Sequence, residues 1–553
     1  MKLLKLSTVA LSIGFSSALL AQTTIIKNVN GYTINNNELV KFHAIKFTDD
    51  KIDHIYTLSN KLPNQLDSTW SIQDGHGKTM LPGLIDAHGH VLSYGNSLMQ
   101  ADLINTKSEQ EGVERAKTYA KANPSVTWIT GRGWNQVQWK SKEFPTKAPL
   151  DEAFPNKPVW LRRVDGHAGW ANSKAMELAG ITAKTQSPSG GEIIRDKNGE
   201  PTGVFIDNAM DLITKNIAPL TEHQLKSTLV KAMNSLAGMG LTSVHDAGID
   251  TNNLNAFKAL TKENNMPIRI NAMLYLPSEN WQKTIDKGSF HSPDHLLNFN
   301  SVKIQADGAL GSRGAALIED YSDHAGHKGL LLHDTDSLNL YINSSMQAGL
   351  QVNTHAIGDN ANKIVLDTYE TAIKTNNSKA MRHRVEHAQV LRLVDIPRFE
   401  ELGVIASMQA THATSDKNMA QDRLGEERIL GAYAWRKLLN ANAVIAAGSD
   451  FPVESPNPFF GLHASVTRQD KDNAPEGGWF ADEKMTRFEA LKSFTIDAAY
   501  SGHQEKLIGS LEAGKKADFI ILQDDYFTID EKQLWKNKVI ETWVNGKRVY
   551  SAK

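Results

Sequence analysis

One unit recurs along the middle of the chain: an amphipathic helix, a glycine and then a short apolar strand. The clearest copy begins with a capping box from Thr221 to Gln224, and Gly238 and Gly240 separate its helix from the strand at residues 241–244. Further copies precede strands at residues 351–354, 383–386, 404–408 and 443–447. Serial helix–strand units form parallel sheets, and this number of them favours a closed (β/α)8 barrel of the α/β class.

The two ends of the chain instead show short alternating strands separated by turns. Examples are residues 39–47 and 52–56 near the N-terminus and 539–544 near the C-terminus, where Asn545 and Gly546 predict a hairpin turn. We therefore expect one small β domain built from both termini. The expected segments are a signal peptide at residues 1–21, β segments at 22–80 and 506–553, a barrel at 81–505 and an insertion into it at about 105–215.

The first residues have the pattern of a secretory signal peptide. Lys2 and Lys5 accompany an apolar run at residues 6–20, and Ala18 and Ala21 provide small residues for cleavage. The chain has no Cys, which excludes disulfides, a lipoprotein anchor and thiolate metal ligands. Its 60 Lys and Arg balance 62 Asp and Glu, so no excess positive charge favours nucleic acid. We expect an exported, periplasmic protein without a stable membrane anchor that acts on a small molecule; homo-oligomerisation stays open.

Polar side chains follow the expected strands at the ends where barrel enzymes carry their chemistry. They are His88, His90, Lys303, His355, His387 and Asp450. Residues two apart on an extended strand face the same way, so His88 and His90 can bind one ion together. Because imidazole and carboxylate ligands suit Zn²⁺ and similar ions, the set predicts a site for one or two divalent cations, with zinc as the expected metal.

Lys303 is unusual in this set, because an ammonium group repels cations. A neutral lysine amine that captures CO₂ becomes a carbamate, which is an anion able to bridge two metals, and burial favours the neutral amine. The alternative is a cationic anchor for the substrate or an ion-pair partner. His383 shares a strand face with His387 but lies deeper in the barrel, which favours a structural role.

Several short motifs of the sequence resemble those of the amidohydrolase superfamily, specifically its amidohydrolase family 3 branch, which includes N-substituted formamide deformylases. They are LPGLIDAHGH (81–90), VKIQADGALGSR (302–313), THAIGD (354–359), HRVEH (383–387), GSDFP (448–452) and GSLEAGKKAD (509–518). The resemblance covers residues 24–553 and implies a distorted (β/α)8 TIM barrel, a composite β-sandwich and a mono- or binuclear metal centre. The implied ligands are His88, His90 and Asp450 for the first metal, carboxylated Lys303 as a bridge, and His355 and His387 for the second.

Residues and resemblance together predict a hydrolase of carbon–nitrogen bonds other than peptide bonds, of the EC 3.5 type. Metal-activated hydroxide would attack an amide carbonyl, with Asp450 as general base and then general acid. The same hydroxide attacks other electrophiles, so a metal-dependent ester, lactone or phosphoester hydrolase is the alternative. A non-catalytic exported solute-binding protein is a third interpretation, and it would not need the ligand set.

Substrate contacts are expected near the strand ends and in the insertion. The candidates at strand ends are His245, Arg313 and His412. The insertion contributes Trp134 and His167, in words that also resemble the family, GRGWNQ (131–136) and RVDGHAGWANS (163–173). A lid that covers the site with aromatic surface competes here with ordinary packing of a subdomain.

Overall fold

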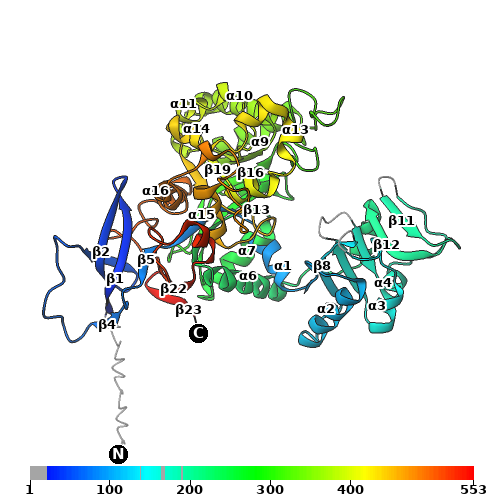
Figure 1. Ribbon diagram of the computed structural model, residues 1–553, viewed down its shortest axis with the longest axis horizontal. Helices are drawn as coiled ribbons and strands as arrows, with labels where there is room; N and C mark the ends of the chain where they lie inside the picture. The colour runs from blue at the N-terminus through cyan, green and yellow to red at the C-terminus, as the bar shows by residue number, and fades with distance from the viewer. Residues whose placement is uncertain (1–20, 137–138, 164–167, 189–190, 553) are drawn as a thin grey trace, which may run out of the picture.

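The computed structural model describes residues 21–136, 139–163, 168–188 and 191–552. Its strands form three sheets, and Figure 1 places the largest of them between the sheet of the chain ends and the sheet of an insertion. The expected signal peptide at residues 1–21 lies almost entirely outside the described residues. None of the described helices combines the length and the apolar character needed to cross a membrane.

The central sheet is a nearly closed barrel of eight parallel strands, which confirms the predicted α/β class. Its strands, in order, are β6 (Leu84–Gly89), β13 (Leu241–Ile249), β14 (Arg269–Leu276), β16 (Leu297–Gln305), β17 (Gln351–Ala356), β18 (Arg384–His387), β19 (Ile405–Met408) and β20 (Ile445–Ala447). The last and first strands meet just beyond β20, where Asp450 N donates to His88 O at 2.7 Å and His90 N donates to Phe451 O at 2.9 Å. This seam brings residues 88–90 against residues 450–451.

Helices separate the strands and cover the barrel, as the repeated unit predicts. Helix α6 (Glu222–Ala237) starts with the expected capping box. The Thr221 side chain accepts a hydrogen bond from Gln224 N, and the Gln224 side chain accepts one from Thr221 N. Its apolar face is fully buried through Leu229, Met233 and Leu236. The other principal helices are α1 (Val91–Leu98), α7 (Thr251–Lys262), α9 (Thr335–Gln347), α10 (Asp359–Asn376), α11 (Arg398–Leu402), α12 (Ala410–Asp416), α13 (Ala420–Arg428), α14 (Trp435–Asn440), α15 (Pro458–Thr467), α16 (Arg487–Ser493) and α17 (Ile496–Ser501).

Strands from both termini join in one mixed sheet. They are β1 (Thr23–Asn35), β2 (Glu38–Thr48), β3 (Lys51–Tyr56), β4 (Ser71–Asp74), β5 (Thr79–Pro82), β21 (Phe519–Leu522), β22 (Val539–Val544) and β23 (Lys547–Ser551). The two halves meet where β5 pairs with β21 in antiparallel register, over 430 residues apart in the chain. Asn545 and Gly546 have φ angles of 48° and 70°, the left-handed values that a tight hairpin turn requires. The predicted union of the termini is confirmed.

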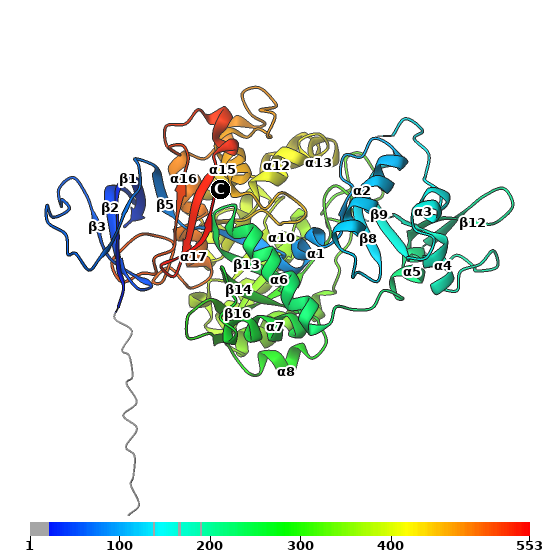
Figure 2. The ribbon, with the colours of Figure 1, turned by 90° about the horizontal axis from the view of Figure 1, so that it is seen from below.

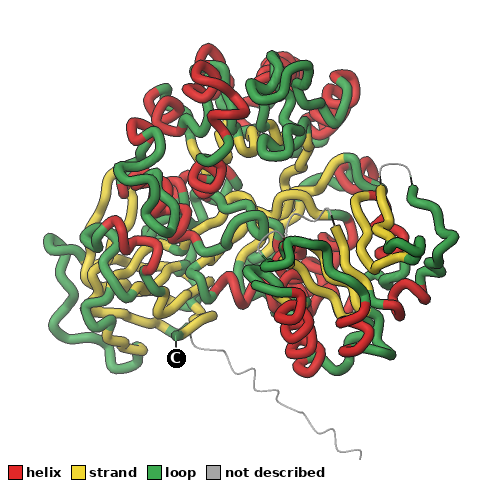
Figure 3. Tube along the Cα trace, turned by 45° about the vertical axis from the view of Figure 1, so that its right-hand side comes forward, coloured by secondary structure: helices red, strands yellow, loops and turns green. Residues whose placement is uncertain are grey.

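The insertion has a six-stranded sheet and a core of its own, at the opposite end of the molecule from the terminal sheet (Figures 1 and 2). Its strands are β7 (Ala101–Asp102), β8 (Ile129–Trp134), β9 (Val159–Arg163), β10 (Ala168–Ala171), β11 (Gly191–Arg195) and β12 (Pro201–Asp207). Helices such as α2 (Glu109–Ala122) pack beside these strands, as Figure 3 shows. Trp134, Trp139 and Trp170 pack on one another inside, with ring centroids 6.0–6.5 Å apart.

Candidate metal centre

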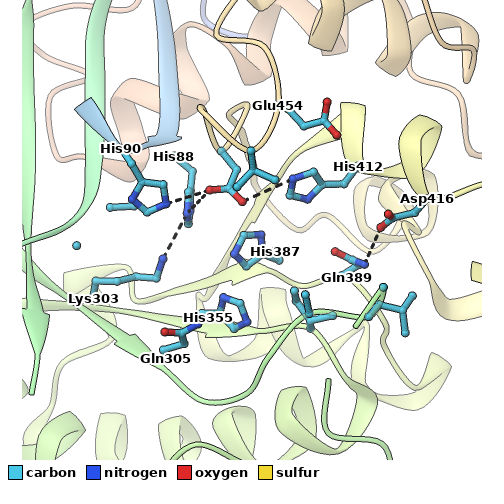
Figure 4. A pocket seen from close by; sticks show the side chains of 18 of the residues that line it. His88, His90, Lys303, Gln305, His355, His387, Gln389, His412, Asp416 and Glu454 are labelled. Atoms are coloured by element: carbon cyan, nitrogen blue, oxygen red, sulfur yellow. Dashed lines mark hydrogen bonds and ion pairs between the residues drawn. The ribbon is translucent and has the colours of Figure 1, made fainter. Parts of the chain in front are cut away.

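A cavity of about 640 Å³ opens at the carboxyl ends of the barrel strands. All six residues expected as metal ligands line it, and Figure 4 shows five of them, the four histidines and Lys303, with their side chains converging from different strands. They are His88, His90, Lys303, His355, His387 and Asp450. The barrel thus gathers residues that lie up to 362 positions apart in the chain, because parallel strands all end at the same face.

Two imidazoles and a carboxylate form the first group suited to a metal ion. His90 Nε2 lies 3.0 Å from Asp450 Oδ1, and His88 Nε2 lies 3.6 Å from the same oxygen. The ligand atoms of all three residues are within 4.8 Å of one another. Donors bound at about 2.0–2.2 Å to one tetrahedral ion would lie about 3.4 Å apart, so this donor set fits a divalent metal in chemistry and spacing.

A second group shares Asp450 and adds His387 and His412. His412 Nε2 lies 3.6 Å from Asp450 Oδ2, which is the oxygen that does not face His90. Asp450 therefore lies between the two groups and offers one carboxylate oxygen to each. His412, expected from the sequence as a substrate contact, lies inside the cavity with its ring stacked 5.8 Å from the ring of His387.

Lys303 and His355 complete the floor of the cavity. Lys303 is 5% exposed and its Nζ lies 3.3 Å from His88 Nε2. Burial lowers the pKa of Lys303, which favours the neutral amine. The His355 ring lies 4.5 Å from the His387 ring, and its Nε2 is 3.4 Å from Asp307 Oδ1.

A buried ionic network beneath the cavity orients His88. His88 Nδ1 contacts Glu386 Oε2, so the proton on Nδ1 points to the carboxylate and Nε2 faces the cavity. Glu386 is held in turn by Arg384, whose Nε donates to Glu386 Oε1 at 2.7 Å. Burial would raise the pKa of Glu386, but Arg384 and His88 outweigh it and hold that pKa well below its usual range. Burial and the nearby Lys303 lower the pKa of His88 to about 4, so its imidazole is neutral at pH 7, as a metal ligand must be.

His387 and Asp450 both have backbone angles that turn their side chains into the cavity. Their φ values are 71° and 61°, in the left-handed region that residues other than glycine rarely adopt. His387 Nδ1 is 2.7 Å from Gln409 Oε1, which leaves Nε2 facing the cavity. Burial lowers the pKa of His387 well below its usual value. Burial raises the pKa of Asp450, but the hydrogen bond with His90 and the neighbouring imidazoles lower it further, so this side chain is a carboxylate.

Asp86 ties together the two segments that carry His88 and Asp450. Its Oδ1 accepts from the backbone N–H groups of His88 at 3.0 Å and Ser449 at 3.1 Å, and its Oδ2 accepts from the Ser449 hydroxyl at 2.6 Å. Gly448 fits here because a Cβ would lie 2.5 Å from His88 N. Burial raises the pKa of Asp86 to about 7 despite these hydrogen bonds.

Three other expected substrate contacts, His245, Arg313 and Trp134, are described and do not line the cavity. His245 lies below it, with Nδ1 2.9 Å from Arg384 Nη1. Arg313 forms an ion pair with Asp323 at 2.8 Å. Trp134 lies within the core of the insertion and donates from Nε1 to Leu161 O at 2.8 Å. His167 lies outside the described residues.

His383, directly before β18, has a structural environment. Its Nδ1 accepts the backbone N–H of Val352 at 3.0 Å, and its Nε2 lies 3.0 Å from Ser378 Oγ. Burial lowers the pKa of His383 to about 3, since protonation would both charge a buried ring and block the acceptor at Nδ1.

The variant His383→Asn is expected to flatten the acid dependence of stability. The pKa of the wild-type ring is depressed on folding, so its contribution is complete above pH 6.5 and is lost as the pH falls towards 3. Between pH 8 and 5 the wild type should lose about 2 kcal/mol that the variant does not lose. Urea unfolding of both proteins at pH 8, 6.5 and 5 measures this difference. Parallel pH profiles would show that His383 does not titrate on unfolding.

The barrel and its buried His and Asp site define a metal-dependent hydrolase, and comparisons with known proteins agree. The sequence model described as the amidohydrolase family matches residues 71–550. Protein LONG AFTER FAR-RED 3 of Arabidopsis thaliana is 35% identical over 489 residues, which cover 86% of this chain and 82% of that protein. The N-substituted formamide deformylase of Arthrobacter pascens is 27% identical over 488 residues, covering 86% and 89%.

The crystal structure of an uncharacterized metal-dependent hydrolase from Pyrococcus furiosus is also similar. It is 27% identical, has a TM-score of 0.76, and the match covers 92% of this chain and 100% of that one. The chain belongs to the amidohydrolase family.

Proposed function

We propose that this protein is an exported hydrolase of an amide-type C–N bond in a small molecule, and that Asp450 is its general base and acid. The observation that carries the proposal is the meeting of His88, His90 and Asp450 in one cavity, beside His387 and His412. The amide bond is supported by the 27% identity to an N-substituted formamide deformylase. The basic, apolar and small-residue order of residues 1–21 supports export.

The residues present would hold one or two divalent ions, with zinc as the expected metal. His88, His90 and Asp450 would hold one, and His387 with His355 or His412 a second, beside Lys303. A bound divalent ion lowers the pKa of water and polarises a carbonyl oxygen.

Asp450 suits the movement of protons in this reaction. Its pKa is well below the usual range, so the side chain is ionised at neutral pH, and an ionised carboxylate oxygen beside the attacking water is able to accept its proton. The same carboxyl group can then deliver that proton to the nitrogen of the leaving amine. His88 and His387 keep their Nε2 atoms toward the cavity because Glu386 and Gln409 occupy their Nδ1 atoms.

Metal analysis combined with a substrate panel tests the proposal. We expect the purified protein to contain one to two equivalents of transition metal and to hydrolyse members of a panel of N-acyl amines, N-acyl amino acids and cyclic amides. His355→Ala should lower both metal content and turnover, because it removes a cavity imidazole, whereas the exposed His223→Ala should change neither. Turnover that survives chelation in metal-free protein, or turnover confined to esters, lactones or phosphoesters, would contradict the proposal.

Lys303→Ala tests the proposed carbamate. We expect turnover to fall by more than about 100-fold, since the variant lacks the anionic ligand that a carbamate on Lys303 would supply. Acetate or propionate should restore part of the activity of Lys303→Ala by placing a carboxylate in the vacated space. As a control, the activity of the variant Lys287→Ala, at an exposed lysine, should not change when either anion is added. Full metal occupancy without rescue would assign Lys303 a different role, such as an anchor for the substrate.

A further inference from the structure

Beyond the residues suited to metal binding, the cavity carries two acidic side chains, Asp416 and Glu454. Asp416 Oδ2 accepts hydrogen bonds from the Tyr433 hydroxyl at 2.6 Å and from Gln389 Nε2 at 3.3 Å. Glu454 Oε1 accepts one from Ser415 Oγ at 2.6 Å. Within the described part of the chain, the second oxygen of each carboxylate makes no hydrogen bond. Each carboxylate therefore keeps one oxygen available to a ligand in the cavity.

No lysine or arginine in the described ranges of the chain forms an ion pair with either carboxylate, and the imidazole of His412 is the basic group that interacts with Asp416. Lys417, which directly follows Asp416, is already paired with Asp470 at 2.6 Å. Among the described residues that line the cavity, Lys303 alone is a lysine or arginine, and its Nζ faces His88. A carboxylate in a partly desolvated cavity is stabilised by an opposite charge, so a cationic ligand fits this wall and an anionic one has no partner there.

The two acids lie on the Asp450 side of the cavity. Asp416 is on α12 with His412, whose Nε2 is 3.6 Å from Asp450 Oδ2, and Glu454 is four residues after Asp450. Figure 4 shows Glu454, His412 and Asp416 along one wall, with Lys303, Gln305 and His355 on the other. If Asp450 delivers a proton to the leaving nitrogen, the amine half of the substrate lies against the acidic wall.

We infer that the substrate carries a cationic ammonium group in its amine half, bound by Asp416 and Glu454. The orientation of the substrate, with its amine half against the acidic wall, rests on the proposed amide hydrolysis. The positive charge of the ligand rests on the lining of the cavity alone. The apolar lining residues Leu310, Ile357 and Val453 suit a methylene spacer between the amide and the ammonium group. N-acyl diamines are the substrate class, and N-acyl amino acids are disfavoured.

Calorimetric binding of three matched amines tests the charge preference without turnover. The probes are 1,5-diaminopentane, hexylamine and 6-aminohexanoate. All three keep one amine that represents the leaving group at Asp450, and they differ only at the far end of the same five-methylene chain, which carries a second ammonium, a methyl or a carboxylate. We expect 1,5-diaminopentane to bind the metal-loaded protein at least about tenfold more tightly than hexylamine, and 6-aminohexanoate to bind most weakly. In the double variant Asp416→Asn/Glu454→Gln, the amide oxygens can still accept the hydrogen bonds from Tyr433 and Ser415. The three probes should bind this variant with similar affinities. The exposed Asp422→Asn on α13 should retain the wild-type order of affinities.

Turnover of the three N-acetyl derivatives of these amines separates this inference from the proposed function. The ratio of kcat/KM between the ammonium and methyl substrates should be at least about tenfold in the wild type and should approach one in the double variant. Hydrolysis without charge preference overturns the inference and leaves the amide hydrolase intact. Charge-selective binding of the amines without hydrolysis of any amide supports the cationic site and overturns the proposed reaction. Tighter binding of hexylamine or 6-aminohexanoate overturns the inference directly.

Discussion

Asp450→Asn is expected to lower kcat by about 10³-fold while the protein remains folded. The amide cannot accept a proton from water or return one to a leaving nitrogen, so both proton transfers lose their carrier. The residue at this position has a φ angle of 61°, and asparagine adopts the left-handed region more readily than most residues. The Asn variant should therefore keep the thermal stability of the wild type.

Kinetics, metal analysis and thermal unfolding of the same preparations check this expectation. Asp450→Ala is the informative comparison, because alanine in the left-handed region adds about 1–2 kcal/mol of strain and should lower Tm as well as kcat. The exposed Asp422→Asn controls for the loss of one negative charge. If Asp450→Asn retained more than about one tenth of the wild-type kcat with full metal content, Asp450 would not be the proton carrier.

Much of the cavity could be predicted from sequence because each candidate ligand follows an apolar strand directly. In a parallel barrel all strands end at one face. The sequence therefore predicts that His88 and His355 lie at the same face of the barrel, although it does not give the distance between them. The left-handed backbone of His387 and Asp450 was not predictable in the same way. At Asp450 the backbone lies at the seam just beyond β20, where Asp450 N donates to His88 O, and this contact joins residues 362 positions apart.

The contacts that join the supporting network to His88 and His245 could not be predicted, because their partners are far apart in the chain. Glu386 directly precedes His387 in the motif HRVEH (383–387). Nothing in the local sequence shows that it contacts His88, which lies 298 residues earlier. His245 follows an apolar run like the other candidates, but in the structure it binds Arg384 below the cavity. Strand alternation was the one available signal: Arg384 and Glu386 share a face, and two opposite charges on one buried face predict an ion pair.

The tryptophans of the insertion show that the role of an aromatic residue is hard to predict from sequence. Trp134, Trp139 and Trp170 stand near expected loops, and the sequence left a lid and ordinary packing as competing interpretations. Their rings pack against one another in the core of the insertion, with Trp134 and Trp170 fully buried. Aromatic residues provide most of the buried area of a small core, so their presence in a loop-rich segment does not by itself indicate a ligand.

Arg384→Met is expected to lower the free energy of unfolding by about 3–5 kcal/mol. The side chain is fully buried and also donates to Ala87 O at 2.7 Å and Ser407 Oγ at 2.8 Å. Its removal leaves Glu386 charged in a dry interior with one remaining partner, His88. Lys363→Met is the matched control, because its ion pair with Asp367 on α10 is 39% and 46% exposed and should contribute less than about 1 kcal/mol.

Glu386→Gln separates the orientation of His88 from the burial of charge. The amide oxygen can still accept the proton on His88 Nδ1, so the ring should keep its direction, but the loss of negative charge makes Nε2 a weaker donor to a metal. Metal affinity, measured by competition with a chelator, should fall by about 10–100-fold. The double variant Arg384→Met/Glu386→Leu should cost less stability than the sum of its two single variants, because it leaves no unpaired buried charge. Strict additivity would show that Arg384 and Glu386 stabilise the barrel independently rather than as an ion pair.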